Sequence, residues 1–272
     1  MLKISIVMPS FNQGELLEET ITSVLSQGYP NIEYIIIDSG STDGSLDIVK
    51  RYSDKLTYWI SEPDKGIWDA LNKGFKQSTG EIMAWLVCGD KYLPWTFEIV
   101  SQIFNDLSNV DWLASSTSLI LNNSGIVCHR SNFLNLGRRN SAINYESVFW
   151  RRSLWEQASN DFEKISYDTP IPELWSHFWK YTILHTTTMP LAAVRYGRSV
   201  SLATTNPVKF WQSFSWKFLL SLPFMGYIAG YTRGRLSYNA KINRWYCPRL
   251  LSGNIIRLIL ESASRITRLI FS

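Results

Sequence analysis

The sequence has few cysteines and lacks the common cofactor-binding motifs. Its three cysteines, Cys88, Cys128 and Cys247, lie far apart, and no C-x-x-C pair occurs. An odd, scattered set argues against a disulfide framework and indicates a reducing compartment. The chain also contains no G-x-G-x-x-G and no G-x-x-x-x-G-K-[ST]. We therefore predict neither a dinucleotide fingerprint nor a P-loop.

Long apolar runs are missing as well. In the aromatic, apolar segment after Pro207, the longest stretch without a charged residue, 218–232, has 15 residues, whereas a membrane span needs about 20. The apolar run at the N-terminus, within MLKISIVMPSFN, is too short for a signal peptide. The three histidines show no zinc-binding spacing. These absences predict a cytoplasmic protein without a transmembrane helix or a zinc site.

Charge is divided unevenly along the chain. Residues 195–272 contain 12 lysines and arginines but one acidic residue, Glu261, which gives this segment a net charge of +11. Residues 1–194 contain 15 basic and 22 acidic residues, a net charge of −7. A basic segment on an acidic body predicts contact with an anionic surface, with a solvated basic face as the alternative. We expect no nucleic-acid partner, because no DNA- or RNA-binding motif is present.

The first half of the chain alternates between strand and helix patterns. Buried strands are predicted at 3–8, 32–37, 56–61 and 82–88, with Pro9 ending the first, and helices at 14–27, 45–52, 67–78 and 95–107. Short connections between such elements predict an α/β fold, a mostly parallel sheet with helices on both faces. In such sheets ligands bind beyond the carboxyl ends of the strands.

The pattern changes near residue 200. We therefore divide the chain into a domain at 1–200 and a basic, aromatic, helical extension at 201–272. Within the extension, residues 254–271 fit an amphipathic helix, with isoleucines and leucines on one face and arginines towards the other. Such a helix can lie in a membrane interface or pack on the protein's own core. The excess of tryptophan and arginine favours the membrane slightly.

Four polar segments follow the predicted strands: VMPSFNQGE, IIIDSGSTDGS, SEPDKGIWDALNKGF and TGEIMAWLVCGDKYLPW. Each motif alone is weak, but their order and spacing over residues 4–105 resemble the nucleotide-sugar-binding half of family 2 glycosyltransferases. The resemblance implies the GT-A fold, which is Rossmann-like. The segment ESVFWRRSLWEQA at 146–158 is similar to the acceptor-side segment of that family.

The resemblance implies a set of residues that bind the nucleotide-sugar. Pro9 to Asn12 would cradle the nucleotide, and Asp38 would accept a hydrogen bond from the uracil ring. The full set is Pro9, Ser10, Phe11, Asn12, Asp38, Asp64, Gly66, Asp69, Asn72, Lys73 and Gly89. The alternative for Asp38 is a turn-forming role, for which Asp43 is the better candidate. The alternative for Asp69 is a carboxylate that only offsets the helix dipole.

The segment MAWLVCGD bears on metal binding. The family usually carries two adjacent aspartates where this chain has Gly89 and Asp90, and the second binds the divalent metal. By this resemblance Asp90 would hold Mg²⁺ or Mn²⁺. Magnesium is commonly bound by one or two carboxylates together with phosphates and waters, so one aspartate can suffice. The alternative is that Asp90 only ends a strand.

The catalytic position departs further from the family. The family places a catalytic aspartate just before a segment like D-[FY]-[DE]-L-W, whereas this chain reads DTPIPELW, with Ile171 at that position. We expect Asp168 or Glu173 to act as the general base instead. A general base contributes roughly 10²–10⁴-fold to the rate.

Three hypotheses follow. The first is an inverting, metal-dependent glycosyltransferase that moves a sugar from a nucleotide donor, expected to be UDP-linked, to a hydroxyl of a glycan or lipid-linked glycan. Residues 201–272 would hold it at the inner face of the cell membrane. The second is a catalytically inactive relative that serves as a nucleotide-sugar-binding scaffold in a polysaccharide assembly complex. The third is an α/β protein whose motifs are turns only.

Overall fold

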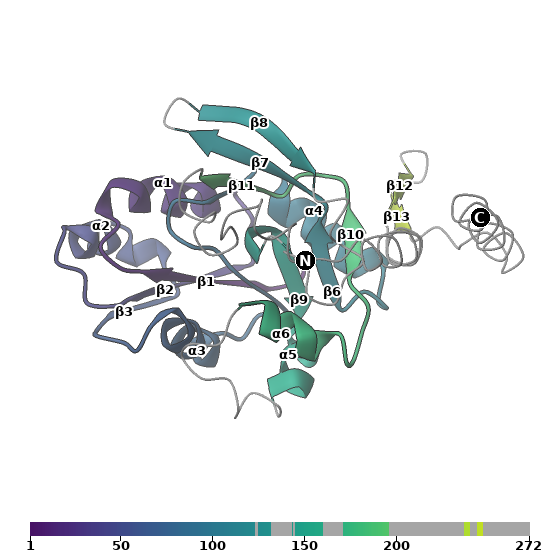
Figure 1. Ribbon diagram of the computed structural model, residues 1–272, viewed down its shortest axis with the longest axis horizontal. Coiled ribbons are helices and arrows are strands. Elements are labelled where there is room, and N and C mark those ends of the chain that lie inside the picture. The colour runs from purple at the N-terminus through teal and green to yellow at the C-terminus, as the bar shows by residue number, and fades with distance from the viewer. Residues whose placement is uncertain are drawn as a thin grey trace, which may run out of the picture.

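The computed structural model of the chain describes residues 1–122, 125–131, 143, 145–159, 171–195, 237–239 and 244–246. Its centre is a seven-stranded sheet with helices on both faces (Figure 1). The strand order is β10-β6-β9-β4-β1-β2-β3. The strands are β1 (Ile4–Ser10), β2 (Ile32–Asp38), β3 (Tyr58–Ser61), β4 (Ile82–Trp85), β6 (Trp112–Ser115), β9 (Val148–Arg151) and β10 (His185–Thr187).

The sheet is mostly parallel, as the sequence predicts. Strand β1 is parallel to β2 and β4, β2 is parallel to β3, and β6 is parallel to β10. The exception is β9, which runs antiparallel between β4 and β6. The strand order places β1 between β2 and β4, so three parallel strands end close to one another at the same edge of the sheet.

A second sheet, of order β5-β11-β7-β8, lies at one side of the first (Figure 1). It consists of β5 (Lys91–Tyr92), β7 (Thr117–Asn122), β8 (Gly125–Ser131) and β11 (Ala192–Arg195). Two further strands, β12 (Ser237–Asn239) and β13 (Arg244–Tyr246), pair antiparallel. The rest of the predicted extension, including the amphipathic helix expected at 254–271, lies outside the described residues. Among those that are described, no helix is both long and apolar enough to cross a membrane.

The helices divide between the two faces of the main sheet because strand side chains alternate. Along β1, Ile4, Ile6 and Met8 enter one core, and Val7 enters the other. Helices α1 (Gly14–Leu25), α2 (Ser45–Arg51) and α4 (Thr96–Asp106) pack on the first core. Helices α3 (Ile67–Gln77), α5 (Arg152–Ser159) and α6 (Ile171–Phe178) pack on the second. The remaining short helices are η1 (Ser53–Lys55) and η2 (Tyr145–Ser147).

The second core contains much of the chain's tryptophan. The rings of Trp85 and Trp175 are stacked, with centroids 5.4 Å apart and an angle of 5° between their planes. Trp112 stacks on Trp175 from another side, at 5.6 Å. Nine of the chain's 12 tryptophans precede residue 200. The tryptophan excess therefore reflects this core, and it is a weaker argument for membrane contact than the sequence suggests.

Two strand boundaries differ from the predictions. Strand β1 does not stop at Pro9 but continues to Ser10, with Pro9 paired opposite Ile37 of β2. In a parallel strand, successive residues form their backbone hydrogen bonds alternately with the two neighbouring strands. Val7 bonds on the β4 side, where its carbonyl accepts the amide of Leu86. The missing N–H of Pro9 therefore faces β4, which has already ended at Trp85. The same early end of β4 leaves residues 86–90 in a turn.

The two arginines of the segment at 146–158 have structural roles. The guanidinium of Arg151 donates to the carbonyls of Phe104 (2.7 Å) and Val110 (2.8 Å), at the end of α4 and just after it. Arg152 donates to the Gly80 carbonyl at 2.8 Å, just beyond α3. Because helix carbonyls at a C-terminus lack partners within the helix, arginines there satisfy them.

A buried carboxylate ties the amino ends of three strands together. Glu33 of β2 is 2% exposed and accepts hydrogen bonds from the Ser5 hydroxyl, the Thr79 amide (2.6 Å) and the Gly80 amide (3.2 Å). The ammonium of Lys3 lies 2.8 Å from it. Burial alone would raise the pKa of Glu33, but the hydrogen bonds from Lys3, Ser5 and Thr79 outweigh it and lower the pKa from 4.5 to about 2.

We predict that Glu33→Gln destabilises the protein at neutral pH. A carboxylate whose pKa falls on folding contributes stability that is fully present above pH 4.5 and is lost as the pH falls through about 2. At about 1.4 kcal/mol per pKa unit, the contribution is about 3 kcal/mol. Urea unfolding of Glu33→Gln and wild type at several pH values measures it. The difference should shrink below pH 4.5, while the exposed Glu98→Gln should match wild type throughout; a pH-independent difference would contradict the assignment.

Candidate functional site

Three strands of the sheet end at the same level. Ser10 at the end of β1 pairs with Asp38 at the end of β2, and Asp38 pairs with Ser61 at the end of β3. On the other side of β1, the chain leaving β4 continues past Val7 into the turn that contains Gly89 and Asp90. The polar segments that the sequence assigns to strand ends are therefore gathered at one edge of the sheet, as predicted.

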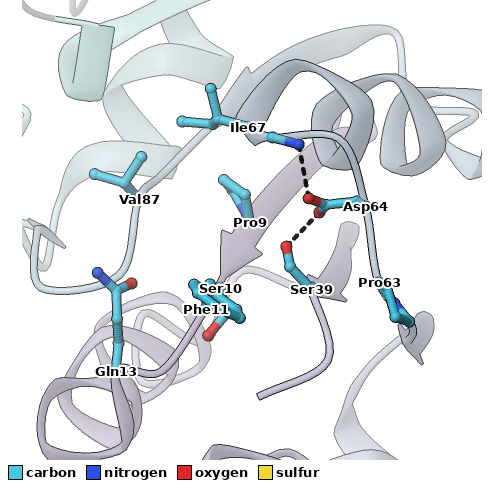
Figure 2. Close-up of a pocket in the computed structure, with 10 residues that line it drawn as sticks. Pro9, Ser10, Phe11, Gln13, Ser39, Pro63, Asp64, Ile67 and Val87 are labelled. Atoms are coloured by element: carbon cyan, nitrogen blue, oxygen red, sulfur yellow. Dashed lines mark hydrogen bonds between the residues drawn. The ribbon is translucent and has the colours of Figure 1, made fainter. Parts of the chain in front are cut away.

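A pocket of about 690 Å³ opens at this edge (Figure 2). Five residues of the predicted nucleotide-sugar set line it: Pro9, Ser10, Phe11, Asp64 and Gly66. The other lining residues are Gln13, Ser39, Pro63, Ile67 and Val87. The walls thus come from the ends of β1 and β2, the loop before α3, and the turn after β4. Several lining side chains are apolar, which is typical of pockets for small organic ligands.

One polar atom in this pocket stands out. Ser10 is 3% exposed, and its hydroxyl has no hydrogen-bond partner among the described residues. A buried polar group without a partner is costly, so such a group in a pocket indicates a ligand that supplies the missing bond. Beside it, the ring of Phe11 is 56% exposed, an unusual state for an aromatic side chain. Together, Ser10 and Phe11 offer a ligand one hydrogen-bonding hydroxyl and one flat apolar ring.

Other buried groups without partners lie elsewhere. The indole N–H groups of four core tryptophans find no acceptor among the described residues: Trp85, Trp112, Trp150 and Trp179. These rings make edge-to-face contacts with other aromatic rings, in which an N–H can point at a ring face. The Nδ1 atom of His185 also finds no partner among the described residues. His185 is on β10, at the opposite edge of the sheet from β3. None of these residues lines the pocket.

Asp38 is placed to hold strand ends together. It is fully buried, and its carboxylate accepts bonds from the Ser41 amide (2.9 Å), the Ser41 hydroxyl (2.5 Å) and the Ser61 hydroxyl (2.6 Å). The predicted contact with a uracil ring would have to be made alongside these bonds. The turn-forming alternative for Asp38 therefore has direct structural support.

Asp43 and Asn12 build the loops around the pocket. Asp43 accepts bonds from the Gly14 amide (2.9 Å) and the Ser45 amide (3.1 Å), so it caps the first residues of both α1 and α2. The bond from Gly14, followed by that from the Ser45 hydroxyl, lowers the pKa of Asp43. Asn12 has a φ of 49° and accepts a bond from the Thr42 amide at 2.9 Å. The predicted turn role of Asp43 is confirmed, and Asn12 connects its loop to the same turn.

The loop before α3 is held by its own charged residues. The carboxylate of Asp64 accepts bonds from the Ser39 hydroxyl and the Gly66 amide (Figure 2). Asp69 accepts a bond from the Lys65 amide at 3.1 Å. Lys73 lies 2.7 Å from the Glu62 carboxylate and 3.6 Å from that of Asp69, and the Glu62 bond raises its pKa. Of the predicted residues here, Asn72 is exposed on α3 outside the pocket lining.

The turn after β4 positions Asp90 beside the pocket rather than in its lining. The Asp90 amide bonds to the Val87 carbonyl at 3.2 Å, and Val87 lines the pocket. Asp90 is 3% exposed, and its Oδ1 accepts the amide of Arg195 at 3.0 Å. Gly89, with a φ of 102°, donates its amide to the Thr20 hydroxyl at 2.8 Å.

Four charged residues lie on the elements next to the turn of Asp90: Glu19, Lys91, Glu146 and Arg195. Glu19 on α1 forms ion pairs with both Lys91 and Arg195. Glu146 in η2 is 2% exposed, and η2 packs against β4, β5 and β11. Burial raises the pKa of Tyr145 and of Tyr92, and the charges of Asp90 and Glu146 raise both further. The charges of Asp90 and Glu146 therefore act on the same two phenols.

This donor set is compatible with a divalent cation. Among the described residues no group of three or more histidine, cysteine, aspartate or glutamate side chains could hold a metal ion. Magnesium nevertheless needs only one or two carboxylates when phosphates and waters complete its shell. Asp90 and Glu146, together with Glu19, Lys91 and Arg195, sum to a charge of −1. An added divalent cation would make the sum positive, which suits a diphosphate.

The two predicted bases fall at or beyond the limits of the described residues. Asp168 lies outside the described residues. Glu173 lies in the first turn of α6, and its side chain is also outside what the structure describes. Ile171, which replaces the catalytic aspartate of the family, is the first residue of that helix.

Some residues near the site were not predicted. Gln13, Ser39, Pro63 and Ile67 belong to the quoted motifs and adjoin predicted residues, so the pattern could have included them. Glu146 and Arg195 gave weaker signals. A carboxylate directly before the apolar strand β9 and an arginine ending β11 are each unremarkable alone, because their proximity to Asp90 depends on the pairing of distant strands.

The chain has an α/β fold with a pocket at the carboxyl ends of its parallel strands. Residues 5–90 match the family "Glycosyl transferase family 2". The match supports the resemblance over this segment. An uncharacterized glycosyltransferase of Rickettsia typhi is 39% identical over 108 residues, 40% of this chain and 34% of that relative. The chain thus spans about one third of the length of this relative.

Solved structures support the fold. The structure of Staphylococcus aureus TarS 1–349 in complex with UDP has a TM-score of 0.56 and 20% identity, covering 71% of this chain and 60% of that one. The mannosyltransferase PcManGT of Pyrobaculum calidifontis, in complex with GDP-Man and Mn²⁺, has a TM-score of 0.55 and 17% identity, covering 78% and 60%. At these identities the likeness establishes the GT-A fold.

We predict that Gly89 cannot be replaced without cost by the aspartate that the family usually carries. A φ of 102° is strained for any residue with a Cβ atom, so Gly89→Ala and Gly89→Asp should each lose about 1–3 kcal/mol of stability. Chemical denaturation of both variants measures this. Equal losses in the two variants would show that the backbone conformation at Gly89, and not the added carboxylate, causes the loss of stability. Wild-type stability in Gly89→Asp would contradict the prediction.

Proposed function

We propose that the protein is a glycosyltransferase that uses a nucleotide-sugar donor, expected to be UDP-linked, and transfers the sugar with inversion to a hydroxyl of a glycan or lipid-linked glycan. The observation that carries this proposal is the pocket at the strand ends of a family 2 domain, with the buried, unpartnered Ser10 hydroxyl and the exposed Phe11 ring at one wall.

The chemistry of the pocket suits the nucleoside half of such a donor. Among the described residues, Asp64 is the only charged one that lines the pocket, and it already accepts two hydrogen bonds. A pocket without a lining cation is a poor site for a diphosphate but a good one for a base and a ribose. The Phe11 ring offers a stacking face, and the Ser10 hydroxyl can donate to or accept from a ring atom.

The diphosphate would lie beyond Val87, towards Asp90. Asp90, with Glu146 beside it, would hold Mg²⁺ or Mn²⁺ there. The bound cation would supply neutralisation of the negative charge that develops on the leaving diphosphate. Arg195 and Glu19 hold the turn on which Asp90 lies.

The acceptor hydroxyl needs a base. In an inverting transfer, a carboxylate removes the proton of that hydroxyl as its oxygen attacks the anomeric carbon, and the nucleoside diphosphate leaves from the opposite side. We assign this role to Glu173, in the first turn of α6, or to Asp168. The acceptor itself, and a peripheral contact of residues 201–272 with the inner face of a cell membrane, are part of the proposal.

A second function, a nucleotide-sugar-binding scaffold without turnover, is favoured by two departures from the family. Ile171 replaces the catalytic aspartate, and Gly89 replaces one of the two aspartates at the metal position. Such a protein would keep the pocket at Ser10 and Phe11 and contribute binding to a polysaccharide assembly complex.

We predict that Phe11→Ala weakens UDP binding about tenfold. Stacking of a base on an aromatic ring is worth about 1–3 kcal/mol, and the ring is exposed before any ligand binds. Isothermal titration calorimetry with UDP, with and without Mn²⁺, measures the change. Ser10→Ala should also weaken binding, because it removes the unpartnered hydroxyl.

Tyr181→Ala is the matched control. Tyr181 is another exposed aromatic residue, at 46% exposure, and it follows α6 outside the pocket lining. It should bind UDP as wild type does. Equal affinities of Phe11→Ala, Ser10→Ala and wild type would refute the pocket assignment.

We predict a further loss in catalysis for Asp168→Asn or Glu173→Gln. Replacing the general base should lower kcat roughly 10²–10⁴-fold while leaving UDP affinity near the wild-type value. Donor hydrolysis and transfer to glycan acceptors measure kcat, and calorimetry measures binding. If wild type binds UDP-sugar but turns over none of the donors and acceptors tried, the scaffold function is correct instead.

A further inference from the structure

Arg195 makes contacts with the turn of Asp90 that go beyond strand pairing. Its backbone amide donates to Oδ1 of Asp90 at 3.0 Å, and its Nε donates to the Gly89 carbonyl at 3.3 Å. Its Nη2 forms an ion pair with Glu19 of α1. With 9% exposure, Arg195 is nearly buried between these partners.

The turn also has restraints of its own. Strand β4 ends at Trp85, and the next strand, β5, has only two residues. Between them, the Leu86 amide bonds to Val7, the Asp90 amide to Val87 and the Gly89 amide to Thr20. The Cys88 thiol also contacts the Gln13 carbonyl, at 3.7 Å. Thr20 is the neighbour of Glu19 on α1. The Arg195 side chain therefore contacts both the turn and the same part of α1.

Strand β11 does not need the Arg195 side chain to stay in place. Ala192 and Ala193 pair with β5, and Ala193 to Arg195 pair with β7. The carbonyl of Leu191 also accepts the Leu93 amide at 3.0 Å. Since these backbone bonds already anchor β11, the side-chain contacts of Arg195 act mainly on the turn.

We propose that Arg195 is a positioning residue for Asp90: its side chain locks the Gly89–Asp90 turn to α1 and fixes the Asp90 carboxylate where it meets the cation of a nucleotide-sugar complex. This inference rests on the proposed function. The charge of the guanidinium is offset by Glu19, to which it is directed, while the carboxylate of Asp90 receives the backbone amide. Arg195 thus orients Asp90 through the turn on which it lies.

The test measures binding rather than turnover. The affinity for UDP is determined by calorimetry with and without Mn²⁺, for wild type, Arg195→Gln, Arg195→Lys and Asp90→Asn. Asp90→Asn should lose the gain in affinity that Mn²⁺ provides. In Arg195→Gln, the increase in UDP affinity on adding Mn²⁺ should be about tenfold smaller than in wild type. Its affinity for UDP without metal should stay within twofold of the wild-type value. Arg195→Lys, which can still donate to Gly89 or Glu19, should restore part of that increase.

A matched control comes from Glu18, the residue before Glu19 on α1. Arg51 forms an exposed ion pair with Glu18, at 3.2 Å. Arg51→Gln removes the same kind of pair from the same helix without touching the turn, so it should behave as wild type. Thermal unfolding of all variants shows whether they are folded at the assay temperature. In a double-mutant cycle, the effects of Arg195→Gln and Glu19→Gln on UDP affinity with Mn²⁺ should not add, since the two side chains form one ion pair.

The outcomes separate the two proposals. If wild type binds no UDP, the proposed function fails, and the positioning role fails with it. If wild type binds UDP more tightly with Mn²⁺ and Arg195→Gln does so equally, the inference alone is overturned. A fall in metal-free affinity that matches the fall with Mn²⁺ also overturns it, because the side chain would then act on the pocket as a whole.

Discussion

The parallel register of β1 with its two neighbours is the constraint on which the site depends. It sets the end of β1 beside the end of β2 and leaves β4 three residues shorter at the same edge. The difference in length creates the turn that holds Gly89 and Asp90. Without that offset, residues 86–88 would continue the ladder opposite Met8 to Ser10, and the edge would present no recess beside Val87. One feature of strand pairing therefore determines both the pocket and the position of the carboxylate next to it.

Most acidic residues at this edge are used to build the loops. Asp38 joins β2 to β3, Asp43 caps two helices, and Asp64 closes the loop before α3. Loops normally carry much of a protein's mobility, and hydrogen bonds of this kind reduce it. A pocket whose walls are bonded to one another before a ligand arrives loses less conformational entropy on binding. These aspartates can thus contribute to affinity without touching the ligand.

The sequence was sufficient for the parallel half of the fold and insufficient for the rest. The strands and helices up to Asp106 have clear periodicity and lie near their predicted positions, because each carries its own local signal. The antiparallel β9 and the sheet containing β5 and β11 are short and depend on partners far along the chain. For the same reason, Asp90 was found through its motif, whereas Glu146 and Arg195 were found only through packing.

The distribution of charge around the edge follows from these differences. Among the described residues, no cation lines the pocket at Ser10 and Phe11, whereas the turn at Asp90 has Lys91 and Arg195, which both pair with Glu19. A diphosphate placed in the pocket would bury its charge beside Asp64 at a high desolvation cost. The same diphosphate beyond Val87 would lie in a region where a bound divalent cation leaves the sum of charges positive. In the proposed function, these charges would orient a nucleotide-sugar with its base towards β2 and its diphosphate towards the turn of Asp90.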